Sequence, residues 1–283
     1  MTTASPAPTT PTGRWPAPPL VSASVGLHAT AAAVALLAPA SAPWALATVA
    51  LNHAALGAAG LWPRSALLGP NVTRLPPAAI ARGGVALTID DGPDPEVTPR
   101  VLDLLDQLGA KASFFCIAER ALAQPALTRE IVRRGHCVQN HSLRHSHWFS
   151  LLGPRALARE VGRAQDALAD LLGERPHCFR APAGLRNPFL DPVLHRLRLH
   201  LVSWSRRGFD TRNGDPSKVL TRLGQTLAAG DILLLHDGHA GRTPGGQPML
   251  LAVLPALLAQ CRAAGLQPLH LRDALPPRGD AWA

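Results

Sequence analysis

Two adjacent carboxylates, Asp90 and Asp91, follow a short apolar run and precede Gly92. Neighbouring carboxylates repel each other and are costly to bury unless a positive charge lies beside them. A divalent metal ion would relieve that cost, with one acid as a ligand and the other as a base. The same stretch, Asp-Asp-Gly-Pro-Asp-Pro, also suits an Asx turn. On these residues alone both interpretations stand.

A pair of histidines, His141 and His145, has the spacing of a metal-binding pair. Imidazoles at positions i and i+4 lie on one face of a helical turn and can bind a single ion. With Asp91 they would form a site of two histidines and one carboxylate that leaves positions open for water and substrate. Zinc is the first choice for one divalent ion in such a site, and cobalt, nickel and manganese are also compatible with it.

Three further residues have types suited to catalysis. Arg180 follows a short apolar stretch, where a guanidinium could hold a catalytic carboxylate in its ionised form. His236 ends the run Ile-Leu-Leu-Leu-His, where an imidazole could protonate a leaving amine. Asp210 could orient that imidazole and raise its pKa. The alternatives are one more arginine in an arginine-rich chain and a structural histidine.

The elements around these residues alternate between short apolar strands and amphipathic helices. The pattern predicts strands over 84–89, 112–117, 137–139, 177–180, 199–204 and 232–235, and helices over 99–108, 127–134, 155–172 and 250–264. Such alternation is typical of a parallel α/β fold, although periodicity does not separate a barrel from an open sheet. The polar motifs follow strand ends, where both architectures place their active sites.

The N-terminal region differs sharply from the rest of the chain. Residues 1–19 are rich in Pro and Thr, and we expect them to be disordered. No charged residue occurs from 15 to 63, and the segments 20–38 and 44–62 approach membrane-spanning length. A transmembrane helical hairpin over 20–63, followed by a linker over 64–79, is therefore predicted. The alternatives are a cleaved signal peptide and a pair of buried helices in a soluble protein.

The charges around the hairpin favour one topology. Arg14 precedes it, whereas Arg64, Arg74 and Arg82 follow it, and the loop between the two segments is uncharged. The positive-inside rule then places the remainder of the chain on the cytoplasmic rather than the periplasmic face of the cell membrane.

The composition narrows the choice of partners. The chain of 283 residues has a formal net charge of +9, but its basic residues are scattered and form no nucleic-acid-binding motif. Nucleic acid is therefore not expected as a partner, whereas anionic lipid is compatible with the hairpin. The four cysteines have no paired spacing and predict no disulfide framework.

The ordered series TIDDG, HSLRH, RAPAG, FDT and LLLHD resembles the NodB-homology polysaccharide deacetylases, carbohydrate esterase family four, over about residues 85–271. The resemblance implies a distorted (β/α) barrel of about seven parallel strands for residues 80–275, with a tail over 276–283. It also implies a role for each motif residue: Asp90 as base, Asp91, His141 and His145 as metal ligands, Arg180 as the residue that steadies the base, and His236 as acid.

The motif around Ala183 implies an oxyanion site at its backbone N–H, flanked by Pro182 and Gly184 as substrate contacts. The family often has Tyr at the position of Ala183, so the wall of the sugar groove differs here. A second departure lies at Arg207, which replaces the first acid of a DxxDW motif, while Asp210 matches the second acid. This change puts polymer substrates in doubt and favours an anionic substrate.

The resulting functional hypothesis is a metal-dependent hydrolase that removes an N-acyl group, with acetyl as first choice, from an amino sugar in a polysaccharide, oligosaccharide or glycolipid. One alternative is a deformylase or deacetylase of a polyprenyl-phosphate-linked sugar. Another class is a carbohydrate-binding pseudoenzyme, which would lack at least one catalytic or metal-ligand residue. The five residues in question are all present: Asp90, Asp91, His141, His145 and His236. A membrane-anchored scaffold would function without metal. The sequence predicts no oligomeric state.

Overall fold

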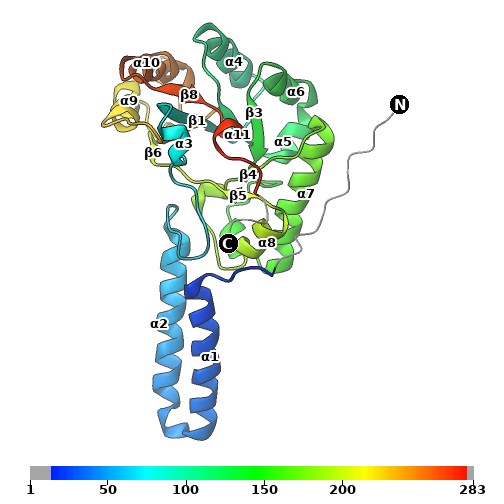
Figure 1. The fold of residues 1–283 in the computed structure, drawn as a ribbon, viewed down its shortest axis with the longest axis vertical. Helices are drawn as coiled ribbons and strands as arrows, with labels where there is room; N and C mark the ends of the chain where they lie inside the picture. The colour runs from blue at the N-terminus through cyan, green and yellow to red at the C-terminus, as the bar shows by residue number, and fades with distance from the viewer. Residues whose placement is uncertain (1–13, 279–283) are drawn as a thin grey trace.

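The computed structural model describes residues 14–278. A parallel sheet forms the centre of the globular domain, and a helical hairpin projects from it (Figure 1). The strand order is β5-β4-β3-β2-β1-β7-β6, and β8 pairs with the start of β1. The strands are β1 Gly84–Asp90, β2 Ser113–Cys116, β3 Cys137–Asn140, β4 Cys178–Phe179, β5 His200–Leu201, β6 Arg206–Arg207, β7 Ile232–His236 and β8 Gln267–Leu269.

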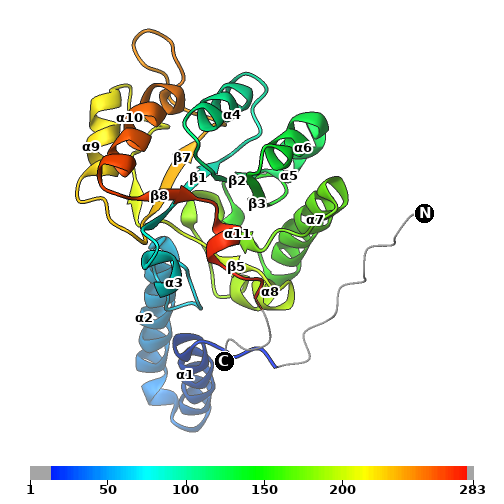
Figure 2. The same ribbon diagram turned by 45° about the horizontal axis from the view of Figure 1, so that its top comes forward.

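Helices lie around this sheet, most of them on its outside, whereas α11 packs on the buried cluster inside it (Figure 2). They are α3 Pro77–Ile80, α4 Val97–Gln107, α5 Ala118–Ala123, α6 Pro125–Arg133, α7 Pro154–Leu172, α8 Leu190–Arg196, α9 Pro216–Gly224, α10 Met249–Ala263 and α11 Leu271–Ala274. Three short 3-10 turns cover Pro39–Ser41, Phe149–Leu151 and Pro182–Gly184. The predicted α/β barrel of about seven parallel strands is confirmed, whereas the short elements α3, α5, α11, β6 and β8 were not predicted.

Side-chain alternation along β1 separates the core from the site. Val85, Leu87 and Ile89 belong to the buried cluster shared with α4 and α10, so they point outward to the helices. Because successive side chains of a strand point to opposite faces, Thr88 and Asp90 point to the inside of the sheet. The same rule applies to β7, whose inner residues lead to His236 at its carboxyl end.

The barrel is distorted where β5 and β6 should meet. Among the described strands these two end the sheet and do not pair with each other. Residues 202–205 cross this gap, with Val202 bridged to Val72 on one side and the Ser205 N–H donating to the Ile232 carbonyl on the other. The backbone carbonyls of residues 202 and 203 are therefore available to a donor inside the barrel.

The hairpin consists of α1 Pro19–Leu37 and α2 Ala42–Leu61. Both helices are long and apolar enough to cross a membrane, which makes them two candidate spans. Ser24 is the one buried residue of α1, so the helices do not form a buried pair in a soluble core. Trp44 and Trp62 are exposed near the two ends of α2, separated by about 27 Å at 1.5 Å per residue. This separation matches the hydrocarbon thickness of a bilayer.

Polar side chains join the two helices of the hairpin. The Asn52 amide donates a hydrogen bond to Ser24 Oγ at 2.8 Å, and the Nε2 atoms of His28 and His53 lie 3.2 Å apart. These contacts pair polar side chains of two otherwise apolar helices with each other.

The segments beside the hairpin pack on the domain. Of the tail predicted over 1–19, residues 1–13 lie outside the described residues, whereas the Trp15 indole donates to Asp191 Oδ2 at 2.8 Å. The segment predicted as a linker, 64–79, buries Leu68 and Leu75 and includes α3. Of the C-terminal tail, 279–283 lie outside the described residues, and Arg278 donates to the Leu199 carbonyl.

Candidate active site

The register of two neighbouring strands brings a carboxylate and an imidazole together. Asp90 of β1 pairs directly with His236 of β7. Both residues end their strands, both are buried, and both lie on the inner face of the sheet. The carboxyl end of the barrel therefore carries the predicted base and the predicted acid side by side.

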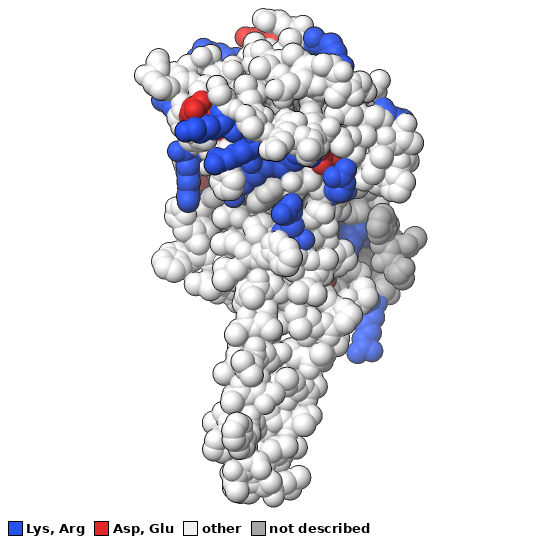
Figure 3. Space-filling view, turned by 90° about the vertical axis from the view of Figure 1, so that its left-hand side faces the viewer, with Lys and Arg blue, Asp and Glu red and all other residues white. Residues whose placement is uncertain are grey.

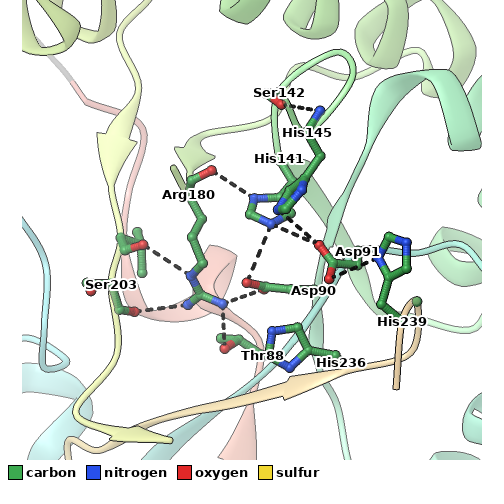
Figure 4. A network of polar contacts seen from close by, with 12 residues as sticks. Thr88, Asp90, Asp91, His141, Ser142, His145, Arg180, Ser203, His236 and His239 are labelled. Carbon is green, nitrogen blue, oxygen red and sulfur yellow. Dashed lines mark hydrogen bonds and ion pairs between the residues drawn. The ribbon is translucent and has the colours of Figure 1, made fainter. Parts of the chain in front are cut away.

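Arg180 is fully buried and fills the gap in the barrel. Its Nη1 atom lies 2.5 Å from Asp90 Oδ1 and donates to Thr88 Oγ1 at 2.9 Å. Nε donates to the Val202 carbonyl and Nη2 to the Ser203 carbonyl. The backbone that crosses the gap thus orients the guanidinium, which holds Asp90 in place (Figure 4). A buried ion pair of this kind is stable only with such additional hydrogen bonds.

His141 and His145 lie in a loop after β3 and not on a helical turn, so the predicted helical geometry is wrong. Ser142 and His145 have positive φ values of 68° and 54°, which a helix cannot contain. The Ser142 hydroxyl accepts a hydrogen bond from the His145 N–H at 2.9 Å and stabilises this turn. The loop still directs both rings toward Asp91 (Figure 4).

The three predicted ligands converge on one point. The Nε2 atoms of His141 and His145 each lie 3.3 Å from Asp91 Oδ1, and one ligand atom from each residue falls within 4.8 Å of the others. His141 Nδ1 donates to the Arg180 carbonyl at 2.8 Å, which leaves Nε2 as the atom that can bind a metal. Asp91 Oδ1 is buried and has no hydrogen-bond partner among the described residues. This donor set therefore fits a divalent cation.

The electrostatics of this cluster favour a bound cation. Burial raises the pKa of Asp91, but the interaction with His141 and the charges of His236 and His145 outweigh it and hold that pKa well below its usual range. Burial, with the charge of His141, lowers the pKa of His145 to about 4. Asp91 is therefore an anion and His145 a neutral imidazole at neutral pH, which are the protonation states that metal ligands require. Burial lowers the pKa of His141, but Asp90 and Asp91 outweigh it and raise that pKa, so a bound cation would have to displace a proton from His141.

His236 is held by the carboxylate of Asp210. Its Nδ1 atom lies 2.9 Å from Asp210 Oδ1, and its backbone N–H donates to Asp210 Oδ2 at 2.8 Å. Burial lowers the pKa of His236, but the hydrogen bond and charge of Asp210, together with Asp90 and Asp91, raise it above the ordinary value. The carboxylate fixes the proton of Nδ1, so Nε2 is the atom that can exchange a proton with substrate.

The segment Pro182–Gly184 forms a 3-10 turn in which Ala183 has a φ of 54°. Ala183 and Gly184 line the cavity, whereas Pro182 is buried and does not line it, and its substrate contact stays a prediction. Gly184 has a φ of 74°, and a Cβ atom there would lie 2.6 Å from the Trp204 ring and 2.7 Å from Pro63. Glycine is required at this position because the end of the hairpin approaches the site closely.

These residues surround a cavity of about 850 Å³ that Arg207 also lines. Sequence reasoning missed many of its wall residues, among them Trp148, Trp204 and His239. His239 Nδ1 lies 3.6 Å from Asp91 Oδ2. Its position three residues after His236, in the same strand-end motif, was the available signal, whereas isolated tryptophans gave none.

A buried contact joins the first turn of α4 to the end of β7. Thr98 Oγ1 donates to Asp237 Oδ2 at 2.5 Å, and burial raises the pKa of Asp237 to about 7. A Cβ atom on Gly92 would lie 2.3 Å from the Asp237 carboxylate. Glycine after Asp91 therefore allows the two strand ends to approach each other. The Asx turn considered above occurs instead at Asp94, whose Oδ1 accepts from the backbone N–H of Glu96.

Comparison with known proteins agrees with this geometry. Residues 80–202 match the family model described as polysaccharide deacetylase. The chain is 32% identical over 193 residues to a peptidoglycan-N-acetylglucosamine deacetylase of Bacillus cereus, covering 68% of this chain and 87% of the relative. It is 32% identical over 202 residues to a chitooligosaccharide deacetylase of Azorhizobium caulinodans, covering 66% and 93%.

The structure of a family 4 carbohydrate esterase from Streptomyces lividans, in complex with acetate, is also similar. It is 32% identical with a TM-score of 0.59, and the match covers 66% of this chain and 91% of that one. This chain belongs to the polysaccharide deacetylase family of hydrolases.

Proposed function

We propose that this protein is a metal-dependent hydrolase that removes the N-acetyl group of an amino sugar. One observation carries the proposal: the buried Asp91 Oδ1 atom, without a hydrogen-bond partner, faces two imidazole nitrogens beside the Asp90–His236 strand pair. This arrangement combines a cation site, a base and an acid on one cavity wall. The names of the similar deacetylases support amide hydrolysis on a sugar.

Asp91, His141 and His145 would hold the ion, zinc being the first choice. When bound, the ion supplies Lewis-acid polarisation of the amide carbonyl and of water. Asp90 removes a proton from the attacking water as the new C–O bond forms. Arg180 keeps the Asp90 carboxylate oriented toward the water, because its other donors are fixed by Thr88 and the backbone of the gap.

His236 acts at the opposite side of the scissile bond. Its Nε2 atom donates a proton to the amide nitrogen as the C–N bond breaks, which gives a free amine and a carboxylate. Asp210 stabilises the protonated imidazole through Nδ1. The backbone N–H of Ala183 stabilises the oxyanion that develops on the carbonyl oxygen.

The test uses full-length protein purified in detergent and loaded with zinc or cobalt. Acetate and formate release from N-acetyl and N-formyl amino sugars is measured for the wild type and for Asp90→Asn. We expect metal-dependent acetate release that the substitution reduces by about 10³-fold. Equal release by chelated and metal-loaded protein would contradict metal dependence, and formate as the main product would identify a deformylase.

The α1–α2 hairpin is proposed to anchor the domain in the cell membrane with both ends in the cytoplasm. The uncharged loop at its far end and the arginines at the domain end support this topology. Because the four native cysteines are buried, single cysteines introduced as Ala40→Cys and Ala66→Cys can report sidedness. In intact cells a membrane-impermeant maleimide should label the former and not the latter. The reverse labelling would place the domain outside, and a chain shortened at its N-terminus would indicate a cleaved signal peptide.

A further inference from the structure

A second hollow, of about 530 Å³, lies beside the catalytic cavity. Trp204 and Arg207 line both spaces, so the two are neighbours. Its wall also includes Trp62, Pro63 and Arg64, the residues that directly follow α2. The hollow therefore connects the end of the hairpin to the catalytic cavity.

Three arginines of this hollow have no acidic partner. Arg64, Arg207 and Arg222 line it, and none of them forms an ion pair with a carboxylate in the part of the chain that the structure describes. The fourth arginine, Arg206, is engaged by Asp231 at 2.5 Å. Among residues 14–278, no acidic side chain lines the hollow. Lys and Arg side chains gather in a band on this face of the domain, above the hairpin (Figure 3).

Aromatic rings hold two of these guanidinium groups. The Phe209 ring centroid lies 4.9 Å from Arg207 Cζ and 5.3 Å from Arg222 Cζ. Contact with an aromatic face fixes a guanidinium while its N–H groups stay available in the ring plane. The Nε atom of Arg207 is buried without a hydrogen-bond partner among the described residues. The guanidinium groups of Arg207 and Arg222 are thus oriented by an aromatic face, and no carboxylate among the described residues occupies them.

The backbone at Phe209 supports a functional arrangement. Its φ is 58°, and its side chain is 44% exposed. A left-handed conformation is strained for an aromatic residue, and such strain is found most often at ligand sites. The neighbouring residue, Asp210, holds His236. Residues 209 and 210 therefore place the Phe209 ring against the two arginines and the Asp210 carboxylate against the imidazole of His236.

We propose that this hollow binds the phosphate group of a lipid-linked amino sugar, with the sugar in the catalytic cavity. This inference rests on the proposed N-deacetylase function and specifies its substrate class. Arginine clusters recognise phosphate oxygens through paired, charge-assisted hydrogen bonds. Arg207 borders both spaces, so a phosphate bound to Arg207 lies next to a sugar in the catalytic cavity. The proposed substrate therefore carries its phosphate directly on the sugar ring.

The position of the hollow selects a lipid as the carrier. Trp62 is exposed at the end of a candidate span, where tryptophan lies at the level of lipid headgroups. Arg64 follows two residues later. A phosphate at the membrane surface would reach these side chains while its lipid chain stays in the bilayer beside the hairpin.

The experiment compares three probes that carry a hexyl chain and a phosphate, a hexyl chain alone, or a phosphate alone. They are N-acetylglucosamine 1-(hexyl phosphate), hexyl N-acetylglucosaminide and N-acetylglucosamine 1-phosphate. Binding is measured by calorimetry with the full chain in phosphatidylcholine nanodiscs and with EDTA present, so that metal-dependent turnover does not interfere. We expect the hexyl phosphodiester to bind at least about ten-fold more tightly than the neutral hexyl glycoside, because of charged hydrogen bonds to phosphate.

Arg207→Gln and Arg222→Gln should each remove most of this preference. Lys218→Gln is the matched control, because it removes the same charge one helical turn from Arg222 without touching the hollow. A wild-type thermal unfolding midpoint shows that each variant keeps its fold, and binding of the neutral glycoside should stay unchanged in Arg222→Gln, because Arg222 does not line the catalytic cavity. A wild-type preference of less than about two-fold, or a preference that survives in both variants, overturns the phosphate site.

Two further results test the lipid carrier and the N-deacetylase function separately from the phosphate site. If N-acetylglucosamine 1-phosphate binds as tightly as the hexyl phosphodiester, the lipid carrier is overturned. Acetate release by zinc-loaded wild type from the same probes is measured in parallel. Absence of release from every probe contradicts the proposed N-deacetylase function, whereas the binding preference decides the phosphate site independently.

Discussion

The two halves of the catalytic cavity differ in how firmly their side chains are held. The inner half, formed by Asp90, Asp91, His141, His145 and His236, is largely buried. Hydrogen bonds hold Asp90, His141 and His236 in place, with Arg180 directly behind Asp90. The outer half, formed by Trp148, Arg207, Arg212 and His239, is more exposed, and Trp148 reaches 70%. Buried, mutually fixed groups suit bond-breaking, whereas exposed groups suit recognition of a substrate. We therefore expect substitutions in the inner half to affect kcat or stability, and those in the outer half to affect KM.

The largest effect is expected on removal of a metal ligand. His145→Ala should reduce zinc from one equivalent to a small fraction and acetate release by about 10³-fold or more, because Lewis-acid catalysis is lost. Elemental analysis of purified protein and an acetate assay measure the two quantities. An outer-half variant that keeps full zinc serves as control. Full acetate release by zinc-free His145→Ala would contradict metal-dependent catalysis, which is the role that distinguishes the inner half from the outer half.

The next effect is expected on stability. Arg180→Gln leaves Asp90 buried without its cation, which should lower the free energy of unfolding by about 3–5 kcal/mol. Denaturant unfolding of the detergent-solubilised protein measures this change. Arg212→Gln, an exposed cavity residue, should change the free energy by about 0.5 kcal/mol or less. Equal losses of unfolding free energy in Arg180→Gln and Arg212→Gln would show that burial does not distinguish the two halves in their contribution to stability.

A smaller effect concerns the pH profile. Asp210 raises the pKa of His236, so His236 stays protonated to higher pH than an ordinary histidine. Asp210→Asn removes that charge and lowers the pKa, and the alkaline limb of kcat should move to lower pH. We also expect kcat at neutral pH to fall by about 10²-fold. An alkaline limb that stays in place would assign the proton donor to another group.

The smallest effect is expected in the outer half. Trp148→Ala should raise KM for an N-acetyl sugar by about five- to ten-fold and leave kcat nearly unchanged, because an exposed ring contributes contact area and not chemistry. Steady-state kinetics of acetate release measure both constants. A fall in kcat without a change in KM would move Trp148 into the inner half.

The strands and their polar ends could be predicted because they depend on local patterns. The run ending at Asp90 and the run ending at His236 are short, apolar and bounded by turn residues, and both form strands as expected. Apart from Pro182, the predicted site residues lie at the catalytic cavity or, like Arg180 and Asp210, directly behind its base and acid. Strand-end motifs in a parallel sheet meet at one edge, which explains this success.

Features that depend on tertiary contacts could not be predicted. The loop that carries His141 and His145 has positive φ at two residues other than glycine, and local sequence rules assign such a spacing to a helix. The break between β5 and β6 depends on Arg180 filling the barrel. Trp148 and His239 reach the cavity from loops whose paths are set by packing, not by periodicity.

The register between β1 and β7 has a consequence for how this domain can change. Because Asp90 and His236 are paired residues, their separation is set by the spacing of adjacent strands, about 4.8 Å, and not by any loop. Loops at the rim can therefore be exchanged or lengthened without moving the proton donor away from the proton acceptor. A single-residue deletion within β7 would instead turn the imidazole toward the helices. Variation and engineering should therefore tolerate length changes around the rim and reject them within these two strands.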